Sequence, residues 1–162
     1  RISDLLRGIL GLPPLGDELK SITIKRDHVN LHLFSKESMD YGHWWTVISP
    51  SESYGWWPKY RVGIWGTLTG VEGELNGITT FNGSPTRDPH HSYPGEEEFH
   101  PILREDSNYK TVQEVNQAIR TFAQKYSGKW SWPWGQNCHS FQMKMMHEVG
   151  LAAPSDVLDV TD

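Results

Sequence analysis

The sequence predicts an α+β fold in which an antiparallel sheet packs against helices. Apolar and polar residues alternate over much of residues 21–80, which is typical of strands that bury one face. From residue 111 onward, apolar residues recur every three or four positions, which is typical of helices. The chain has 162 residues, a length that fits one domain and would be cramped for two. We therefore expect an N-terminal helix and linker over residues 1–20 and a single domain over residues 21–162.

The first segment is expected to form a short amphipathic helix. Its apolar residues fall at helical spacing, at Ile2, Leu5, Leu6, Ile9 and Leu10. Gly11, Pro13 and Pro14 then end the helix. The chain opens on Arg1 with neither an initiator Met nor the apolar core of a signal peptide, so we expect it to be part of a longer protein.

Strands are expected from Ser21 onward. The alternating apolar residues are Ile22, Ile24, Val29, Leu31 and Leu33. The polar tripeptide at 26–28 is predicted to be the hairpin connection between them. A third strand is predicted over residues 44–48, and aromatic segments at 54–57 and 61–68 continue the sheet. Their strand context predicts that Trp45 and Trp65 belong to the core.

Residues 82–109 are rich in Gly, Pro, Asn, Asp and His, and predict a long surface excursion that carries no core. A helix is then predicted to begin at Thr111, because Glu114 three residues later completes a capping box. Its apolar face is formed by Val112, Val115, Ile119, Phe122 and Tyr126. A second helix is predicted from about Asn137, with Gly150 just beyond its last turn.

The composition excludes several classes of function. The net charge is −5 and no local basic patch is evident, which argues against binding of nucleic acid. No stretch approaches the roughly 20 apolar residues of a membrane span, so no integral membrane segment is expected. With 8 Trp, 6 Tyr and 5 Phe, the core must be largely aromatic, which excludes disorder for most of the chain. The single cysteine, Cys138, excludes an intrachain disulfide and a thiolate-rich metal site.

Cys138 is the first candidate for chemistry, because it falls at the opening turn of the predicted second helix. The unpaired backbone N–H groups there and the positive end of the helix dipole favour a thiolate. The same N–H groups could receive an oxyanion. A lone cysteine is more commonly a small buried apolar residue, so a nucleophile at this position needs a base.

His43 is the candidate base. It stands at the beginning of a predicted strand, directly after Gly42 and before Trp44. A thiolate and imidazolium pair requires one histidine near the cysteine in space, with its second nitrogen facing an orienting acceptor. A histidine on a strand that faces a helix N-terminus meets this requirement.

The order of these two segments carries a resemblance to a known family. A strand histidine in Gly-His-Trp-Trp at 42–45, followed downstream by Asn-Cys-His-Ser-Phe at 137–141, resembles the circularly permuted papain-like cysteine hydrolases. These include NlpC-like peptidases and lecithin retinol acyltransferase-like enzymes. Segments 52–58, 86–91 and 130–141 are also similar to toxin domains of bacterial polymorphic toxins and type VI secretion effectors. The resemblance covers about residues 20–151 and implies a permuted papain-like fold and a cysteine peptidase or amidase without a cofactor.

The resemblance also implies a third polar residue that orients the histidine from the next strand. That segment offers Glu52, Ser53 and Tyr54, and we choose Glu52 because a carboxylate best stabilises an imidazolium. The next candidates, in the polar excursion, are Asp88, His90 and His91.

Four further residues are expected around the substrate. Gln136 competes with the backbone N–H of Cys138 as the oxyanion donor, since papain-like enzymes often add an amide there. The aromatic residues expected to wall the substrate cleft are Trp44, Trp57 and Trp134.

The family implies a substrate and partners as well. Peptidoglycan stem or cross-linking peptides are the leading substrate, with hydrolysis of an amide bond. The domain would be secreted, or injected by a secretion system, as an antibacterial effector that acts in the periplasm or cytoplasm of the target cell. A cognate immunity protein is then an expected partner. A protein substrate, or a lipid ester as in the acyltransferase branch, stays open.

Two rival readings come from other classes. Zinc accepts imidazole and carboxylate ligands, and the polar excursion offers Asp88, His90, His91, Glu97, Glu98 and His100. Their spacing matches neither His-Glu-x-x-His nor its reverse, so we expect a solvated acidic loop and no metal. The many tryptophans alternatively suit a non-catalytic glycan-binding module.

Overall fold

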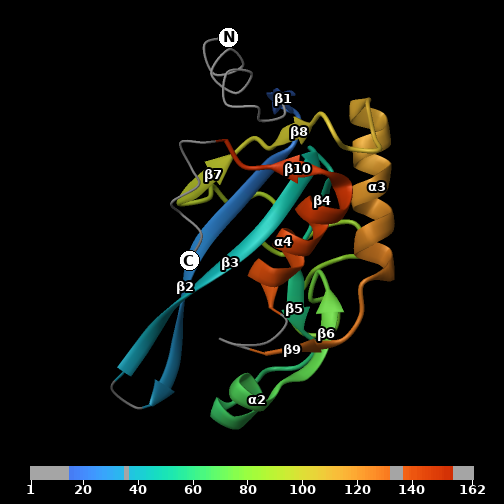
Figure 1. Ribbon diagram of the computed structural model, residues 1–162. Coiled ribbons are helices and arrows are strands. Elements are labelled where there is room, and N and C mark those ends of the chain that lie inside the picture. Colours follow the sequence, from blue (N-terminus) through green and yellow to red (C-terminus); the bar gives the residue numbers. More distant parts are fainter. Residues whose placement is uncertain (1–14, 35–36, 132–136, 155–162) are drawn as a thin grey trace.

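The computed structural model describes residues 15–34, 37–131 and 137–154, and it confirms the α+β class. Its strands pair antiparallel, and the described ones form three small sheets that are accompanied by three helices (Figure 1). One sheet has the order β1-β8-β10 and joins Leu15–Glu18, Ile102–Arg104 and Leu151–Ala152. The predicted N-terminal helix lies outside the described residues.

The central sheet has the order β4-β3-β2-β7. Its strands are β2 (Thr23–Phe34), β3 (Glu37–Ser49), β4 (Glu52–Tyr54) and β7 (Glu97–Phe99). β2 and β3 form a long hairpin that projects from the body of the molecule (Figure 1).

The hairpin connection predicted at 26–28 is wrong, because these residues lie inside β2. Arg26 pairs with Trp44, and Asp27 pairs with His43. The tripeptide contains no Gly, Pro or Asn to turn the chain. Its polar side chains are compatible with a strand, since Arg26 reaches across to Glu97 on β7, with 3.4 Å between guanidinium and carboxylate.

The third sheet has the order β5-β6-β9 and joins Trp56–Pro58, Val71–Leu75 and Lys129–Trp130. Between β5 and β6 the chain forms a short helix, α2 (Ile64–Thr69), where a strand was predicted. The Thr69 hydroxyl donates to the carbonyl of Trp65 one turn earlier, at 2.6 Å. The prediction that Trp65 belongs to the core is also wrong, because its side chain is 78% exposed. A short surface helix cannot bury all of its faces.

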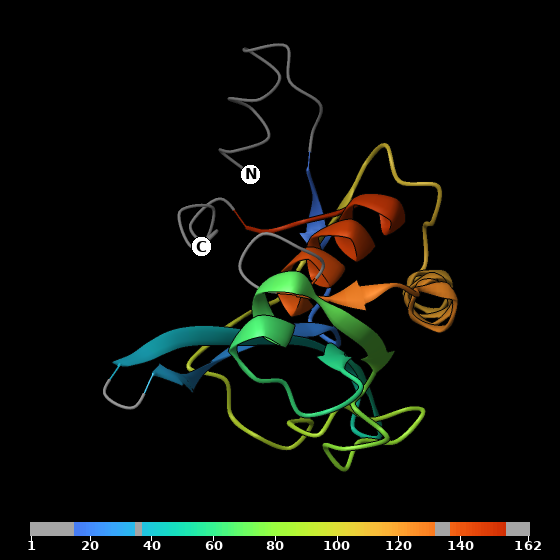
Figure 2. The same ribbon diagram turned by 90° about the horizontal axis from the view of Figure 1, so that it is seen from below.

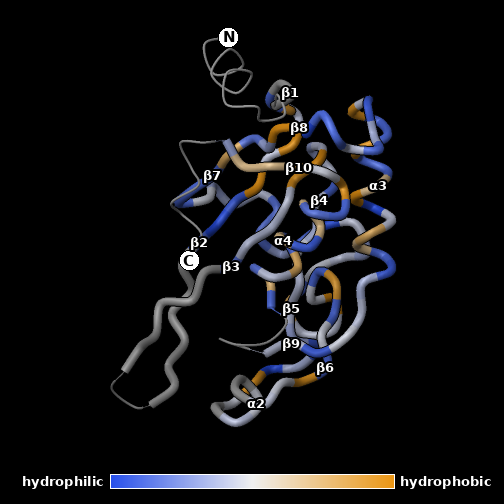
Figure 3. The backbone as a smooth tube through the Cα atoms, in the orientation of Figure 1, coloured by the Kyte–Doolittle hydropathy of each residue, from blue (hydrophilic) through white to orange (hydrophobic). Residues whose placement is uncertain are grey.

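The two predicted helices are confirmed. α3 (Val112–Lys125) begins after Thr111, whose hydroxyl accepts the N–H of Glu114. α4 (Cys138–Val149) begins after Asn137 and ends at Gly150, which adopts the left-handed conformation at φ 81°. Along α3, hydrophilic and hydrophobic positions alternate as expected for a helix with one apolar face (Figure 3).

The core between α4 and the strands β4 and β5 is aromatic, as predicted. Trp56 stacks parallel to Phe141 of α4, and Tyr54 is 1% exposed. Two polar side chains are satisfied inside this layer: the Thr46 hydroxyl donates to Gln142, which in turn donates to the carbonyl of Tyr54. These contacts fix α4 against β3 and β4, and therefore fix the position of its first residue.

The excursion over 82–109 carries more structure than predicted. β7 and β8 lie within it, Ile102 is 5% exposed, and Asp88 and His91 are buried. Figure 2 shows much of this excursion on the side of the β2–β3 hairpin that faces away from α4. A segment of polar composition therefore supplies buried polar groups to the interior.

Within the described ranges, no helix is both long enough and apolar enough to span a bilayer.

The N-cap of α4 gives the first testable prediction. The Asn137 side chain accepts the N–H groups of His139 and Ser140, so Asn137→Ala should lower the free energy of unfolding by about 1 kcal/mol. Asn137→Ser retains a capping oxygen and should stay close to the parent. Urea denaturation of the three proteins measures the difference, and equal midpoints for the Ala and Ser variants would contradict the role of the cap.

Candidate active site

The structure brings Cys138 and His43 together. His43 lies on β3, Cys138 is the first residue of α4, and the imidazole and the thiol are hydrogen-bonded to each other. Both are buried, with His43 1% and Cys138 0% exposed. The packing of α4 on β3 thus places the cysteine sulfur beside an imidazole, in the arrangement that a thiolate nucleophile requires.

Asp88, from the polar excursion, is the carboxylate that contacts His43. Its Oδ2 and Oδ1 lie 3.2 and 3.3 Å from His43 Nε2. Because Asp88 occupies Nε2, the other ring nitrogen, Nδ1, is the one left for the thiol. The three side chains therefore form a continuous chain from sulfur through imidazole to carboxylate, with Asp88 in the orienting position.

Glu52, predicted to be the partner of His43, is not near it. Its carboxylate accepts two hydrogen bonds from the Arg120 guanidinium, at 2.6 and 2.7 Å, and one from the Tyr54 hydroxyl. Glu52 pairs with Ser49 in the β3–β4 ladder, six residues along β3 from His43, which corresponds to roughly 20 Å of extended strand. Glu52 instead ties β4 to α3.

The charges at this site stabilise each other. Burial by itself lowers the pKa of His43, but the charge and hydrogen bond of Asp88, together with the Cys138 interaction, outweigh it and raise that pKa to about 10. Burial by itself raises the pKa of Asp88, but the charge of His43 and hydrogen bonds from His43, Trp57 and His90 hold it below its usual range. At neutral pH His43 is therefore an imidazolium and Asp88 a carboxylate.

Asp88 is held by several donors besides His43. The indole N–H of Trp57 donates to Oδ2 at 2.7 Å, and the backbone N–H of His90 donates to Oδ1 at 2.8 Å. Gly55 leaves the space for this carboxylate, since a Cβ there would lie 2.2 Å from Oδ2. The carboxylate has no freedom to turn away from His43.

Ser53 and His91 fix the backbone of Asp88 in turn. The Ser53 hydroxyl accepts the N–H of Asp88 at 2.9 Å and lies 2.7 Å from Nδ1 of His91. His91 Nε2 lies 2.8 Å from the carbonyl of Pro50, which only accepts, so Nε2 donates to it. His91 thus links the buried Ser53 hydroxyl to the backbone at Pro50.

Asn76 anchors the start of the excursion. It is 0% exposed, and its side chain donates to the carbonyls of Ser53 and Ser84 and accepts the N–H of Gly55. Its backbone has φ 59°, a left-handed conformation that asparagine tolerates better than most residues. The bond to Ser84 holds the start of the excursion, and the other two hold β4 at Ser53 and the residue after β4, Gly55, so Asn76 ties the excursion to β4.

A cleft of about 580 Å³ adjoins His43. Its lining is mostly aromatic and apolar, and consists of His43, Trp57, Pro58, Arg61, Val62, Phe81, Asn82, Pro89, His90, Tyr93 and Trp130. Trp57 is among the residues that line this cleft. Its ring centroid is 4.2 Å from that of His43. Cys138 is 0% exposed and does not line the cleft.

The other residues predicted to surround the substrate do not line this cleft in the part of the chain that the structure describes. Trp44 is 7% exposed and lies in the core, with its ring 5.5 Å from His139 and 6.4 Å from Phe99. The prediction that it walls the cleft is wrong, because residues 43 and 44 face opposite sides of β3 and His43 takes the cleft side. Trp134 and Gln136 lie outside the described residues.

The residues of the rival metal site are dispersed. Asp88 binds His43, Glu97 pairs with Arg26, and His100 contacts the carbonyl of Ile22 at 2.9 Å. Among the residues that the structure describes, no group of three or more His, Cys, Asp or Glu side chains is placed to hold a metal ion.

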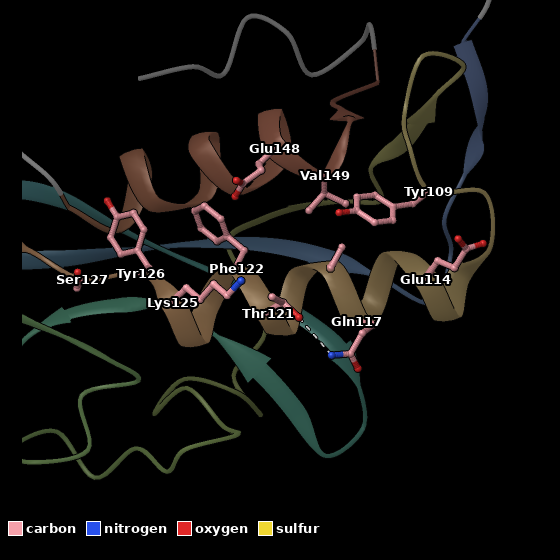
Figure 4. A pocket seen from close by; sticks show the side chains of 11 residues that line it. Tyr109, Glu114, Gln117, Thr121, Phe122, Lys125, Tyr126, Ser127, Glu148 and Val149 are labelled. Atoms are coloured by element: carbon pink, nitrogen blue, oxygen red, sulfur yellow. Dashed lines mark hydrogen bonds between the residues drawn. The ribbon is translucent and has the colours of Figure 1, made fainter.

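A second groove, of about 690 Å³, lies between α3 and α4 (Figure 4). It is lined by aromatic residues such as Tyr109, Phe122 and Tyr126, with Glu114 and Lys125 at its edges. Neither His43 nor Cys138 lines it. The groove beside α3 is therefore separate from the site at which an imidazole, a thiol and a carboxylate converge.

Comparison with known proteins does not extend this description: no protein-family model, no curated protein and no solved structure matches the chain. The chemistry of the site must be inferred from its own geometry.

The role of Asp88 can be tested through the titration of His43. Asp88→Asn removes the charge that raises the pKa of His43 to about 10 and leaves the burial that lowers it, so the ring should lose its proton at a markedly lower pH. NMR of the His43 ring across pH 5–11 measures this change. His147, exposed near the end of α4, is the internal reference. A His43 titration near pH 10 in both proteins would exclude Asp88 as its charge partner.

Glu52→Gln should give the opposite pattern. It removes the charge of a partly exposed ion pair with Arg120, so the free energy of unfolding should fall by about 1 kcal/mol or less. The His43 titration should not move, because Glu52 does not contact the ring. Urea denaturation and the same NMR titration supply both measurements, and a shifted His43 titration in this variant would restore Glu52 as a candidate.

Proposed function

We propose that this domain is a cysteine-dependent hydrolase that cleaves an amide bond, with Cys138 as nucleophile, His43 as acid and base, and Asp88 as the residue that orients and charges His43. The observation that carries this proposal is the buried chain of contacts from the Cys138 thiol through His43 to Asp88, beside an aromatic cleft. Asp88 takes the role that was first expected of Glu52.

The catalytic cycle follows from these positions. The Cys138 thiolate attacks the substrate carbonyl carbon, a carbon–sulfur bond forms, and the carbonyl oxygen becomes an oxyanion at the N-terminus of α4. The His43 imidazolium gives its proton to the amine as the carbon–nitrogen bond breaks. Water then attacks the thioester while His43 takes its proton, and the acid leaves with release of the thiolate. Asp88 stabilises the imidazolium before the first proton transfer and again after the second.

Access to the thiol requires a conformational step. Cys138 is 0% exposed, whereas His43 lines the cleft, so a substrate carbonyl reaches the sulfur only after covering side chains move aside. Such opening on substrate binding is common in enzymes that exclude water from a reactive intermediate. The cleft beside His43 is the path that substrate would take.

The permuted papain-like fold is part of the same proposal. The histidine strand precedes the cysteine helix in the chain, and an antiparallel sheet packs against that helix, which supports the permuted order. By resemblance, the substrate is a peptidoglycan peptide, and the domain is an antibacterial effector delivered by secretion or injection to the periplasm or cytoplasm of a target cell. An immunity protein would be its protective partner.

One observation favours a second candidate. The aromatic walls of the cleft, which include Trp57, Phe81 and Trp130, would also suit stacking against sugar rings in a non-catalytic glycan-binding module. A module of that kind has no use for a buried imidazolium and carboxylate, so we rank it second.

The decisive experiment treats purified peptidoglycan with the parent protein and with Cys138→Ala, followed by mass analysis of released fragments. The parent should release peptide fragments and Cys138→Ala none, while His43→Ala should be slower by at least about 1,000-fold. Lys125→Gln, on the remote groove, should match the parent. A chelator should have no effect.

Other outcomes are equally clear. Fragments released by Cys138→Ala, or activity abolished by the chelator, would contradict the thiol mechanism. Retention on peptidoglycan by every variant, with no release by any, would favour the glycan-binding module. A parallel digestion of a lipid ester tests the acyltransferase branch of the family.

A further inference from the structure

The cleft beside His43 has an electrostatic character that its aromatic walls do not explain. Its ionisable lining residues are His43, Arg61, His90 and Tyr93, and no carboxylate lines it among the residues that the structure describes. The chain as a whole carries a net charge of −5. The charge of the cleft lining is therefore opposite in sign to the net charge of the chain.

Arg61 is the permanent charge in this lining. The charge of His43 is compensated by Asp88 at 3.2 Å. Burial lowers the pKa of His90, and the charge of His43 lowers it further, so His90 is neutral at neutral pH. The charge of Asp27, on β2, acts in the opposite direction and raises the pKa of His90, but Asp27 does not line the cleft.

The Arg61 charge has no partner in the part of the chain that the structure describes. Other cations of the molecule do have partners: Lys59 lies 3.5 Å from Glu72, and Arg120 forms a bidentate pair with Glu52. Arg61 makes no hydrogen bond and no ion pair with a described residue, although it lines the cleft. Arg61 is an exposed residue beside apolar walls, and a guanidinium binds carboxylates through two parallel hydrogen bonds.

The geometry points to Arg61 as the subsite for a substrate carboxylate, so that the cleft takes an acidic peptide whose apolar side chain packs on the aromatic walls. This inference rests on the proposed function, because the peptide must lie in the cleft that reaches His43. Trp57, on β5, flanks His43, and Arg61 follows the end of that strand, so the carboxylate binds to one side of the reacting amide.

The carboxylate has two sources, a free C-terminus or an acidic side chain. Four short acetylated peptides separate them: alanine-phenylalanine-alanine as the free acid or the amide, and the amidated peptide with glutamate or glutamine in place of its first alanine. Each is titrated calorimetrically into the full chain carrying Cys138→Ala, which removes turnover and keeps the cleft.

We expect at least one acid form to bind roughly tenfold or more tightly than its neutral partner, as for a charge-assisted hydrogen bond. Arg61→Gln should abolish this preference, and Arg61→Lys should retain part of it. Lys125→Gln changes the net charge equally at the remote groove and should keep the preference in full. The peptide pair that shows the preference identifies the source of the carboxylate.

Equal affinities within both pairs, undetectable binding of all four peptides at millimolar concentration, or the same loss in Lys125→Gln as in Arg61→Gln would overturn the subsite. These readings do not depend on the thiol. Acid-selective binding by a chain whose parent form hydrolyses nothing would leave the subsite standing and remove the proposed function. Hydrolysis by the parent protein without any preference for the acid peptides would remove the subsite and leave the proposed function standing.

Discussion

The buried ion pair between His43 and Asp88 is the constraint on which the rest of the site depends. Two charges taken out of water cost several kcal/mol each unless they are paired and hydrogen-bonded. Here the carboxylate is paired with His43 and also accepts from Trp57 and His90. Because the pKa of His43 is raised to about 10, its share of the stability is complete below the ordinary value of 6.5 and is lost as pH rises toward 10. The lowered pKa of Asp88 has the opposite sign, and its share is lost in acid.

This constraint explains why a polar excursion is built into the interior. Asp88 reaches His43 only because Gly55 presents no side chain where the carboxylate lies, and because Ser53 holds the Asp88 backbone. Asn76 and His91 in turn satisfy the polar groups that this arrangement buries. Each of these residues would be a liability in an ordinary core. Together they form a network with few remaining degrees of freedom, which is the condition for holding an imidazole in one orientation.

Much of the fold could be predicted from the sequence where local rules decide. The caps at Thr111 and Asn137 and the glycine at 150 define α3 and α4 from neighbouring residues alone, and the structure confirms both helices. The choice between Glu52 and Asp88 is different, because both are carboxylates after polar turns and only the tertiary arrangement places one at His43. Trp65 was misplaced for a related reason: an aromatic residue in an alternating segment predicts burial only if a neighbouring layer covers it. A signal for Asp88 did exist, in a glycine between the aromatic residues 54 and 56.

The cost of burying the charges of His43 and Asp88 also helps to distinguish a catalytic role of the pair from a purely structural one. A buried charge pair rarely stabilises a fold more than apolar side chains of similar volume would, so stability alone gives little reason to keep one. In the proposed mechanism, a pair that keeps an imidazole charged beside a thiol has a use, since the imidazolium holds a proton for the leaving group. His43 is also the member of the pair that lines the cleft, while Asp88 stays behind it. The buried charge therefore lies where the proposed mechanism requires it.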